Sequence, residues 1–266
     1  MGVPSVFLRT FGCNFTCGGF GMPRGERTLE LDAIVKNSGS YKTYRDLPLV
    51  STGCDSYASW HPEFKHLSPM LDIDEIAIKI VQMLPYGHWM DEHLVITGGE
   101  PLLGWQRSYP ELLDHDLMKT LGELTFETNG TQMLTPEFRQ YLLNWTLGNK
   151  NRGRNALTFS VSPKLSVSGE SRDDAIRPEV VIQYEGVGYT YLKFVVASEE
   201  DVDEAVEVLD IYRKSGFKGP AYLMPVGGVE SVYSMNNKNV ALAAMKHGLR
   251  YSDRLQVPLF KNEWGT

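Results

Sequence analysis

Short apolar runs alternate with amphipathic stretches along the chain. Runs rich in β-branched and aromatic residues predict strands at Val6–Leu8, Leu94–Thr97, Leu124–Glu127, Leu157–Val161, Tyr191–Val196 and Ala221–Met224. Apolar residues three and four positions apart predict helices between them, at Asp74–Leu84, Tyr109–Leu121, Pro136–Leu147, Glu199–Ser215 and Asn236–His247. Asp72 or Asp74 can cap the first of these helices. The repeated alternation predicts an α/β fold with a largely parallel sheet.

The number of strand–helix units limits the architecture. Six or so units are too few for an eightfold barrel, so we expect a partial barrel in a single domain that spans residues 1–266. Residues 18–53 interrupt the alternation with several glycines and a polar stretch that has no periodicity, which predicts an inserted loop or lid. The charged residues 148–155 are predicted to form a solvated surface turn.

Composition and charge exclude several classes of protein. The 26 Lys and Arg against 33 Asp and Glu give a net charge of −7, which argues against a nucleic-acid partner bound through bulk charge. The 42% hydrophobic and 22% charged residues are ordinary for a globular protein. No apolar run approaches the roughly 20 residues of a spanning helix, and the N-terminus lacks the pattern of a signal peptide. We therefore expect a cytoplasmic protein with no membrane partner.

Three cysteines form the first candidate site. Cys13 and Cys17 lie four residues apart after the first strand, and Cys54 joins them if the insertion folds back. Three thiolates leave one iron of a four-iron cluster open, which makes that iron a chemical site. A structural zinc site with His61 or His66 as the fourth ligand explains the cysteines equally well. Buried, unreactive thiols are a weaker alternative, because the neighbouring residues are glycine or asparagine and not apolar.

The ends of later strands carry further unusual residues. Gly98, Gly99, Glu100 and Pro101 follow the second predicted strand. Paired glycines allow a backbone to approach a ligand closely, and the proline fixes the turn so that Glu100 can face a cationic amino group. An ordinary tight turn is the alternative.

These features together resemble the radical S-adenosylmethionine superfamily, whose usual cluster motif is Cys-x3-Cys-x2-Cys. More narrowly, the chain resembles the 7-carboxy-7-deazaguanine synthases of the queuosine and 7-deazapurine pathway. The matching stretches run almost from end to end, at Gly2–Arg9, Phe11–Asn14, Cys54–Trp60, Ile96–Leu102, Phe126–Thr131, Val161–Lys164 and Arg254–Val257.

The resemblance implies a fold and a reaction. The fold is a partial (β/α)6-like radical S-adenosylmethionine barrel. The reaction is that of a carbon–nitrogen lyase, which converts 6-carboxy-5,6,7,8-tetrahydropterin into 7-carboxy-7-deazaguanine with loss of ammonia, through a 5′-deoxyadenosyl radical. An external one-electron donor such as flavodoxin or ferredoxin is implied as a partner. The resemblance is compatible with a homodimer but does not decide the oligomeric state.

The resemblance also implies ligands. Cys13, Cys17 and Cys54 hold a 4Fe-4S cluster whose open iron binds S-adenosylmethionine. The residues implied to hold that cofactor are Gly98, Gly99, Glu100, Glu127 and Ser162. The residues implied to face the substrate are Arg9, Gly98, Lys164 and Gln256. For Glu127, Ser162 and Lys164, a structural ion pair or cap is the alternative.

Two polar residues have more specific implied roles. Arg9 pairs with the substrate carboxylate, which suits its forked donors. Ser56 stands where the family usually has threonine and is implied to be a hydroxyl ligand of Mg²⁺. A turn serine that caps Asp55 explains Ser56 equally well.

The chain departs from the family pattern in three places. Thirty-six residues separate Cys17 from Cys54 where the superfamily usually has two, and we interpret them as an insertion because Asp-Ser-Tyr follows Cys54 as expected. The chain begins after the Gln-Gly-Glu-Gly loop with which the family contacts its substrate, so either the start is truncated or the substrate site differs. Phe260 stands where the family commonly has a substrate-facing histidine.

Three other hypotheses remain. An activating enzyme for a glycyl-radical partner would need no Mg²⁺, and the blocks at 161–164 and 254–257 argue against it. A zinc-binding, non-enzymatic protein leaves the turn at 98–101 unexplained. A relative that kept the fold without the activity is the third.

Overall fold

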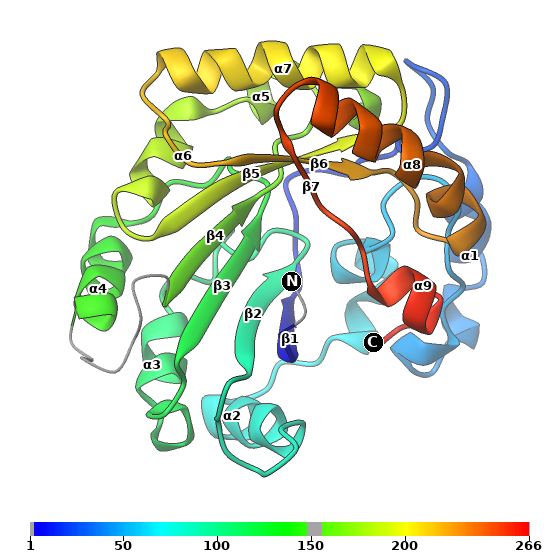
Figure 1. The fold of residues 1–266 in the computed structure, drawn as a ribbon. Coiled ribbons are helices and arrows are strands. Elements are labelled where there is room, and N and C mark those ends of the chain that lie inside the picture. Colours follow the sequence, from blue (N-terminus) through cyan, green and yellow to red (C-terminus); the bar gives the residue numbers. More distant parts are fainter. Residues whose placement is uncertain (1–2, 148–155, 266) are drawn as a thin grey trace.

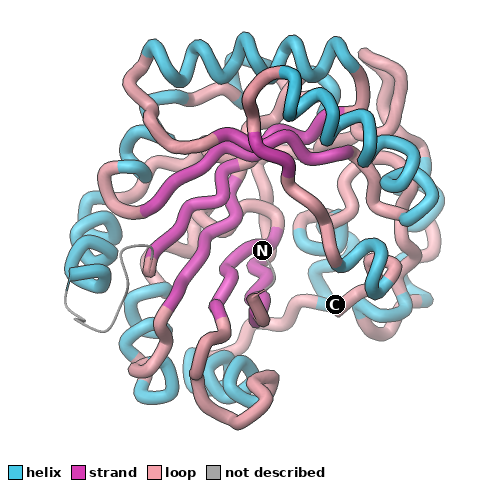
Figure 2. The backbone as a smooth tube through the Cα atoms, in the orientation of Figure 1, coloured by secondary structure: helices cyan, strands magenta, loops and turns pink. Residues whose placement is uncertain are grey.

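The computed structural model describes residues 3–147 and 156–265. In these residues seven parallel strands form one sheet, in which each strand pairs with the next along the chain (Figures 1 and 2). They are β1 (Ser5–Thr10), β2 (His93–Gly98), β3 (Glu123–Thr128), β4 (Leu157–Val161), β5 (Tyr189–Val196), β6 (Ala221–Pro225) and β7 (Arg250–Tyr251). The predicted α/β fold and its first six strands are confirmed. No pairing in the described residues joins β7 to β1, so the sheet has two edges.

Helices follow most of the strands and lie outside the sheet (Figure 1). They are α1 (Glu30–Val35), α2 (Ile73–Gln82), α3 (Tyr109–Asp114), α4 (Pro136–Leu147), α5 (Arg172–Ala175), α6 (Pro178–Glu185), α7 (Glu199–Lys214), α8 (Glu230–Lys246) and α9 (Gln256–Phe260). The Asp72 side chain caps α2, accepting a hydrogen bond from the Glu75 amide at 2.8 Å, as one of the two predicted candidates. None of the helices in these residues is long and apolar enough to cross a membrane.

Several element boundaries differ from the prediction. The helix expected to continue from Tyr109 to Leu121 breaks at His115, whose side chain accepts a hydrogen bond from the Leu117 amide and starts a separate turn. Helix α8 begins at Glu230, earlier than the expected Asn236, while α6 and the two-residue β7 were not predicted. The surface turn expected at 148–155 lies outside the described residues.

The inner face of the sheet is polar near the carboxyl ends of the strands, whereas the other face packs its apolar side chains into the main core. On β5 the side chains alternate between buried and half-buried, and Lys193 belongs to the half-buried set. The register places Arg9 of β1 beside Thr97 of β2, and Glu127 of β3 beside Ser160 of β4. Because neighbouring residues in a parallel register share a face, a row of polar side chains crosses the inner face near the carboxyl ends of the strands.

The insertion at 18–53 shares a small apolar cluster with the residues that follow Cys54. Ile34, Leu47 and Val50 come from the insertion, Tyr57 and Phe64 from the segment after it, and Trp264 packs against the cluster. The Trp264 and Tyr57 rings meet edge to face at 5.5 Å, so the C-terminal segment packs on this shared cluster. Figure 1 shows α1 and α9 on the same side of the molecule. The role of the insertion as a lid stays a prediction.

Candidate active site

The three cysteines lie together despite their separation in the sequence. Cys13 and Cys17 follow β1, Cys54 ends the insertion, and all three belong to one small apolar cluster with Phe15. Burial raises the pKa of each thiol, to about 11 for Cys54. The charges of Cys13 and Cys54 raise the pKa of Cys17 further, whereas the Lys164 ammonium acts in the opposite direction on all three.

The chemistry of this donor set fits a three-thiolate cluster. The Phe15 amide donates to the Cys13 sulfur at 3.4 Å, and the Trp60 side chain hydrogen-bonds to Cys54. Such a cluster would take one thiolate from each of the three cysteines, so the three sulfur atoms would not need to share a single metal ion. Within 3–147 and 156–265, no three His, Cys, Asp or Glu side chains are placed to share one metal ion.

The two histidines of the zinc hypothesis are engaged elsewhere. The ring nitrogens of His66 lie 2.9 Å from the Glu63 carbonyl oxygen and 3.3 Å from that of Tyr41. The Nδ1 atom of His61 accepts a hydrogen bond from the Glu63 amide at 3.3 Å. The His61 contact caps a short turn after the insertion, and in the described residues neither ring belongs to a group of three or more side chains that could hold one metal ion.

The turn after β2 lies directly on the cysteine loop. A Cβ atom at Gly98, where φ is +141°, would lie 2.1 Å from the Thr10 carbonyl oxygen. One at Gly99 would lie 2.2 Å from the Gly12 carbonyl oxygen, to which the Glu100 amide donates at 2.7 Å. Both glycines are therefore required by the contact between these two loops.

Glu100 is fully buried and connects two strand ends. Its Oε1 accepts hydrogen bonds from the Leu102 amide at 3.0 Å and from Thr128 Oγ1 at 2.8 Å, and its Oε2 accepts one from the Asn129 amide at 2.7 Å. Burial raises the pKa of this carboxyl, although the three hydrogen bonds oppose the rise. The carboxylate thus joins the turn after β2 to the loop after β3.

Asn14, between the first two cysteines, extends this network. Asn129 Nδ2 donates to Asn14 Oδ1 at 2.9 Å, and Asn14 Nδ2 donates to Thr131 Oγ1 at 3.1 Å. In the sequence, Asn14 is only part of a stretch that matches the family. Its place between two cysteines could have predicted that its amide binds a neighbouring strand end.

The inner face of the sheet carries an ion pair that was not predicted. Lys193 Nζ lies 3.3 Å from Glu127 Oε1, and Thr97 Oγ1 donates to Glu127 Oε2 at 3.4 Å. The Lys193 charge, helped by that of Arg9, lowers the pKa of Glu127 against the effect of burial. The signal for Lys193 was a lone lysine in the apolar run Tyr191–Val196.

A second ion pair ties the C-terminal segment to the third cysteine. Arg254 Nη2 lies 2.5 Å from Asp55 Oδ2, and its Nη1 donates to the Gly227 carbonyl oxygen at 2.6 Å. Burial would raise the pKa of Asp55, but the charges of Arg254 and Arg9 lower it overall. Neither Asp55 nor Arg254 had been given this role from the sequence.

Arg9 and Ser56 meet at this site. Arg9 Nη1 donates to Ser56 Oγ at 3.4 Å, and the Ser56 hydroxyl lies 3.4 Å from Asp55 Oδ1. The charge of Arg9 acts on both Asp55 and Glu127, and that of Arg254 acts on Lys193. The Asp55–Arg254 and Glu127–Lys193 ion pairs therefore lie in the electrostatic range of Arg9, whose side-chain hydrogen bond in the described residues goes to the Ser56 hydroxyl and not to a carboxylate.

The remaining predicted residues lie on two other segments. After β4, the Ser162 amide donates to the Thr128 carbonyl oxygen at 2.8 Å, and Lys164 Nζ donates to Ser162 Oγ at 3.2 Å. Gln256 begins α9 at the C-terminal segment, where Phe260 is 53% exposed. Ser162 and Lys164 thus lie near the thiols, whereas Phe260 is turned largely to solvent.

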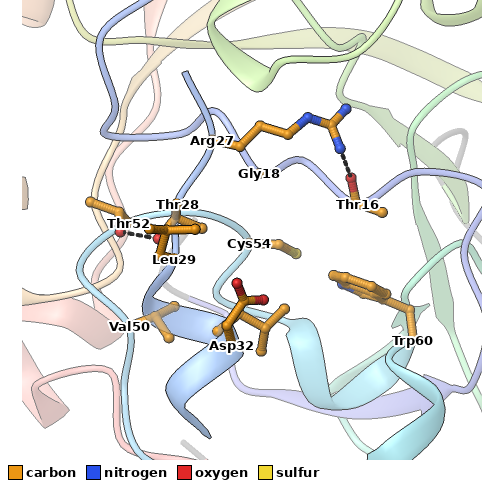
Figure 3. A pocket seen from close by; sticks show the side chains of 11 residues that line it. Thr16, Gly18, Arg27, Thr28, Leu29, Asp32, Val50, Thr52, Cys54 and Trp60 are labelled. Atoms are coloured by element: carbon orange, nitrogen blue, oxygen red, sulfur yellow. Dashed lines mark hydrogen bonds between the residues drawn. The ribbon is translucent and has the colours of Figure 1, made fainter. Parts of the chain in front are cut away.

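Two pockets flank the cysteine loop. One, of about 310 Å³, lies between this loop and the insertion, and Figure 3 shows the side chains of Asp32, Cys54 and Trp60 around its centre. The other, of about 340 Å³, is lined by Asn14, Phe15, Thr131, Gln132, Glu170, Asp174 and Arg177. That the insertion supplies one wall of a pocket beside Cys54 was not predicted from the sequence.

Comparisons with known proteins agree with the resemblance stated from the sequence. The chain is 29% identical to a 7-carboxy-7-deazaguanine synthase of Halobacterium salinarum, over 98% of this chain and 84% of the relative. It is 28% identical to one of Pyrobaculum aerophilum, over 90% and 96%, and 26% identical to one of Rhodopirellula baltica, over 100% and 82%.

No family model and no solved structure matches the chain. The similarity to the curated relatives nevertheless extends through the cysteine loop, the inner face of the sheet and the C-terminal segment, because it spans nearly the whole chain. The chain is therefore a relative of the 7-carboxy-7-deazaguanine synthases, as its sequence predicted, and it is an enzyme of their lyase class.

Proposed function

We propose that this enzyme converts 6-carboxy-5,6,7,8-tetrahydropterin into 7-carboxy-7-deazaguanine and ammonia by radical S-adenosylmethionine chemistry. The relatives carry the name of this activity. The observation that carries the proposal is the cationic Arg9, which lies beside the Asp55–Arg254 and Glu127–Lys193 ion pairs near Cys54 and donates to a neutral hydroxyl. A cation without a carboxylate partner suits a substrate that bears a carboxylate.

The residues of the cysteine loop and its neighbours would hold the cofactors. Cys13, Cys17 and Cys54 are proposed to hold a 4Fe-4S cluster, with Gly98, Gly99, Glu100 and Ser162 on the side of S-adenosylmethionine. When bound, these groups supply the one-electron chemistry that removes a hydrogen atom from the substrate. An external one-electron donor, such as a flavodoxin or ferredoxin, is the proposed partner.

Arg9 and its neighbours would hold and orient the substrate. Arg9 is proposed to bind the carboxylate, because its guanidinium contacts only a neutral hydroxyl among the hydrogen bonds of the described residues. The resemblance implied that Glu127 faces S-adenosylmethionine. Because Lys193 and Thr97 hold its carboxylate and the charge of Arg9 acts on it, we propose instead that it lies with the substrate groups. Lys164 and Gln256 are proposed to complete this side. The reaction needs no net oxidant, because the atoms of the pterin are divided between the product and ammonia.

Ser56 is proposed to bind Mg²⁺ together with substrate oxygens. Its hydroxyl lies between Arg9 and Asp55, and a hard cation such as Mg²⁺ prefers oxygen ligands. Ser56→Thr keeps the hydroxyl, so we expect it to keep the dependence of turnover on Mg²⁺. Ser56→Ala should lose that dependence, and an unchanged dependence in this variant would remove Ser56 from the site.

The test is anaerobic reconstitution followed by turnover. We expect about four irons and four sulfides per chain, and formation of the deazaguanine product from the carboxytetrahydropterin under a low-potential reductant, detected by mass spectrometry. Cys54→Ala should lose the cluster, whereas Ser40→Ala, an exposed change in the insertion that precedes Cys54, should retain it. A colourless, zinc-loaded protein would overturn the radical chemistry. A brown protein that cleaves S-adenosylmethionine but leaves this pterin unchanged would overturn the substrate alone.

A further inference from the structure

One carboxylate from a distant loop binds the backbone of the cysteine loop. Glu170 lies between β4 and α5, and its Oε1 accepts hydrogen bonds from the Thr16 amide at 2.9 Å, the Thr16 hydroxyl at 3.1 Å and the Cys17 amide at 2.6 Å. Three donors on one oxygen, two of them consecutive amides, form an anion-binding concavity in the backbone. Nothing in the proposed chemistry above uses this contact.

The contact coincides with a strained residue. Cys17 has φ of +49°, one of the few non-glycine residues of the described chain in the left-handed region. A residue with a side chain adopts that conformation only at an energetic cost, because its Cβ atom crowds the backbone. The hydrogen bond from the Cys17 amide to a carboxylate is of the strong, charge-assisted kind and offsets this cost. Glu170 therefore stabilises the backbone conformation from which Cys17 presents its thiol.

The surrounding backbone fixes Glu170 in place. The Gly19 amide donates to the Ser168 carbonyl oxygen at 2.9 Å, and a Cβ at Gly19 would lie 2.7 Å from the Gly169 amide nitrogen. The Glu170 amide in turn donates to Ser168 Oγ at 3.3 Å. The start of the insertion and the loop after β4 thus lie directly against each other, which holds the carboxylate at the cysteine loop.

This arrangement has two electrostatic effects in the same direction. A negative charge beside a ligand of an iron–sulfur cluster disfavours the addition of an electron. Amides that donate to Glu170 are also unavailable to donate to cluster sulfur, and hydrogen bonds to the sulfurs favour the reduced state. Both effects lower the reduction potential of a cluster held by Cys17.

We propose that Glu170 is a positioning residue that fixes Cys17 for cluster binding and lowers the reduction potential of the bound cluster. The inference rests on the proposed 4Fe-4S cluster at Cys13, Cys17 and Cys54. It adds to that proposal a residue outside the cysteine motif that both builds and tunes the site.

The reduction potential of the reconstituted protein tests the electrostatic part. Glu170→Gln keeps an acceptor oxygen and removes the charge, so the cluster should assemble with unchanged iron content and titrate at a more positive potential. Glu170→Ala also frees the Thr16 and Cys17 amides. The reduction potential of the cluster in this variant should be more positive still, or a chelator should remove the cluster faster than from the wild type. Glu185→Gln is the matched control, because Glu185 is another half-buried carboxylate that accepts a backbone hydrogen bond, from Lys218 at 2.9 Å. A Glu170→Gln potential equal to those of the wild type and this control would overturn the tuning role.

Amide exchange in the metal-free chain tests the positioning part without a cluster. Hydrogen–deuterium exchange of the Thr16 and Cys17 amides should be about tenfold or more faster in Glu170→Ala than in the wild type, because each amide loses a hydrogen bond to a charged group. Glu185→Ala should leave these two amides unchanged. Equal exchange in the wild type and Glu170→Ala would overturn the positioning role. If the wild type holds no cluster, the proposed function fails, and the exchange result still stands.

Discussion

The role of Arg9 depends on the residues that surround it in the folded chain. In the sequence it is a lone arginine at the end of a strand, and a surface position would explain it. The structure places its guanidinium beside Ser56 and within the electrostatic reach of Asp55 and Glu127. It is thus a cation at the mouth of a polar site, with donors left over for a ligand.

Replacing Arg9 tests its role in substrate binding. Arg9→Gln removes the charge, and we expect kcat/KM for the carboxytetrahydropterin to fall by about 10- to 100-fold, since a hydrogen bond to a charged group contributes roughly 1.5–3 kcal/mol. Arg9→Lys keeps the charge without the fork and should recover part of the loss. Arg45→Gln, an exposed change in the insertion, is the control. Equal steady-state kinetics for Arg9→Gln and this control would contradict the assignment.

The buried hydrogen bonds of Glu100 predict that this residue contributes to the free energy of unfolding. In Glu100→Gln one carboxylate oxygen becomes an NH₂ group, so a buried donor must face either the Asn129 amide or the Leu102 and Thr128 donors. We expect the free energy of unfolding of the metal-free chain to fall by about 1–3 kcal/mol. Urea denaturation measures this, with Glu137→Gln on the exposed side of α4 as the control. A change as small as that of the control would show that the network tolerates an amide.

At the level of elements, the insertion and the C-terminal segment contribute to one apolar cluster. The Trp264 ring packs edge to face on Tyr57, which lies three residues after Cys54. Residues that are 207 positions apart in the chain thus form one small cluster beside the third cysteine. An insertion without periodicity can therefore be ordered, because its few apolar residues meet partners from elsewhere.

Trp264→Ala tests this dependence. Loss of the ring from a half-buried position should lower the stability of the cluster by about 1–3 kcal/mol. Limited proteolysis should then cut the insertion at 18–53 faster than in the wild type, with fragments identified by mass spectrometry. Phe260→Ala removes an exposed aromatic ring from the same segment and should leave the cutting rate unchanged. Equal cutting rates in all three proteins would mean that the insertion is ordered without the tail.

For the whole molecule, the ion pair between Glu127 and Lys193 predicts a pH dependence of stability. The folded pKa of Glu127 lies below its ordinary value of 4.5, so its contribution is present above that pH and is lost as the pH falls further. Burial lowers the pKa of Lys193, but the charge of Glu127, the interaction with Tyr191 and the hydrogen bond to Glu127 together raise it above 10.5. The contribution of Lys193 is therefore lost as the pH rises beyond that value.

Lys193→Met should remove the acid-side dependence. Wild-type stability should fall more steeply than that of the variant between about pH 5 and about pH 3. The size of the difference should be about 1–2 kcal/mol, because the Glu127 side chain keeps 35% of its exposure and solvent screens the pair. Urea unfolding across this range measures it, with Lys119→Met, which breaks an exposed ion pair, as the control. Parallel curves for the wild type and Lys193→Met would contradict the coupling.

The sequence predicted the elements better than their ends. Strands β1 to β6 are buried on at least one face, so their sequences are short apolar runs. Such runs can be recognised in the sequence, and they predicted these strands. Helix α3 ends before His115, whose ring accepts a hydrogen bond from the Leu117 amide, and β7 is only two residues long. Neither feature leaves a periodic signal, because each depends on a local side-chain contact or on a neighbouring strand.

The sequence by itself determined the α/β alternation, the three cysteines, the Gly98–Glu100 turn and the resemblance to a family. Periodicity and motif spacing are local properties, so they can be read along the chain. Only the tertiary structure decided which charged and polar groups meet. The pairs of Asp55 with Arg254, Glu127 with Lys193 and Glu170 with Cys17 join residues that are 199, 66 and 153 positions apart. Such contacts depend on how strand ends and the insertion converge in space, and no local pattern specifies them.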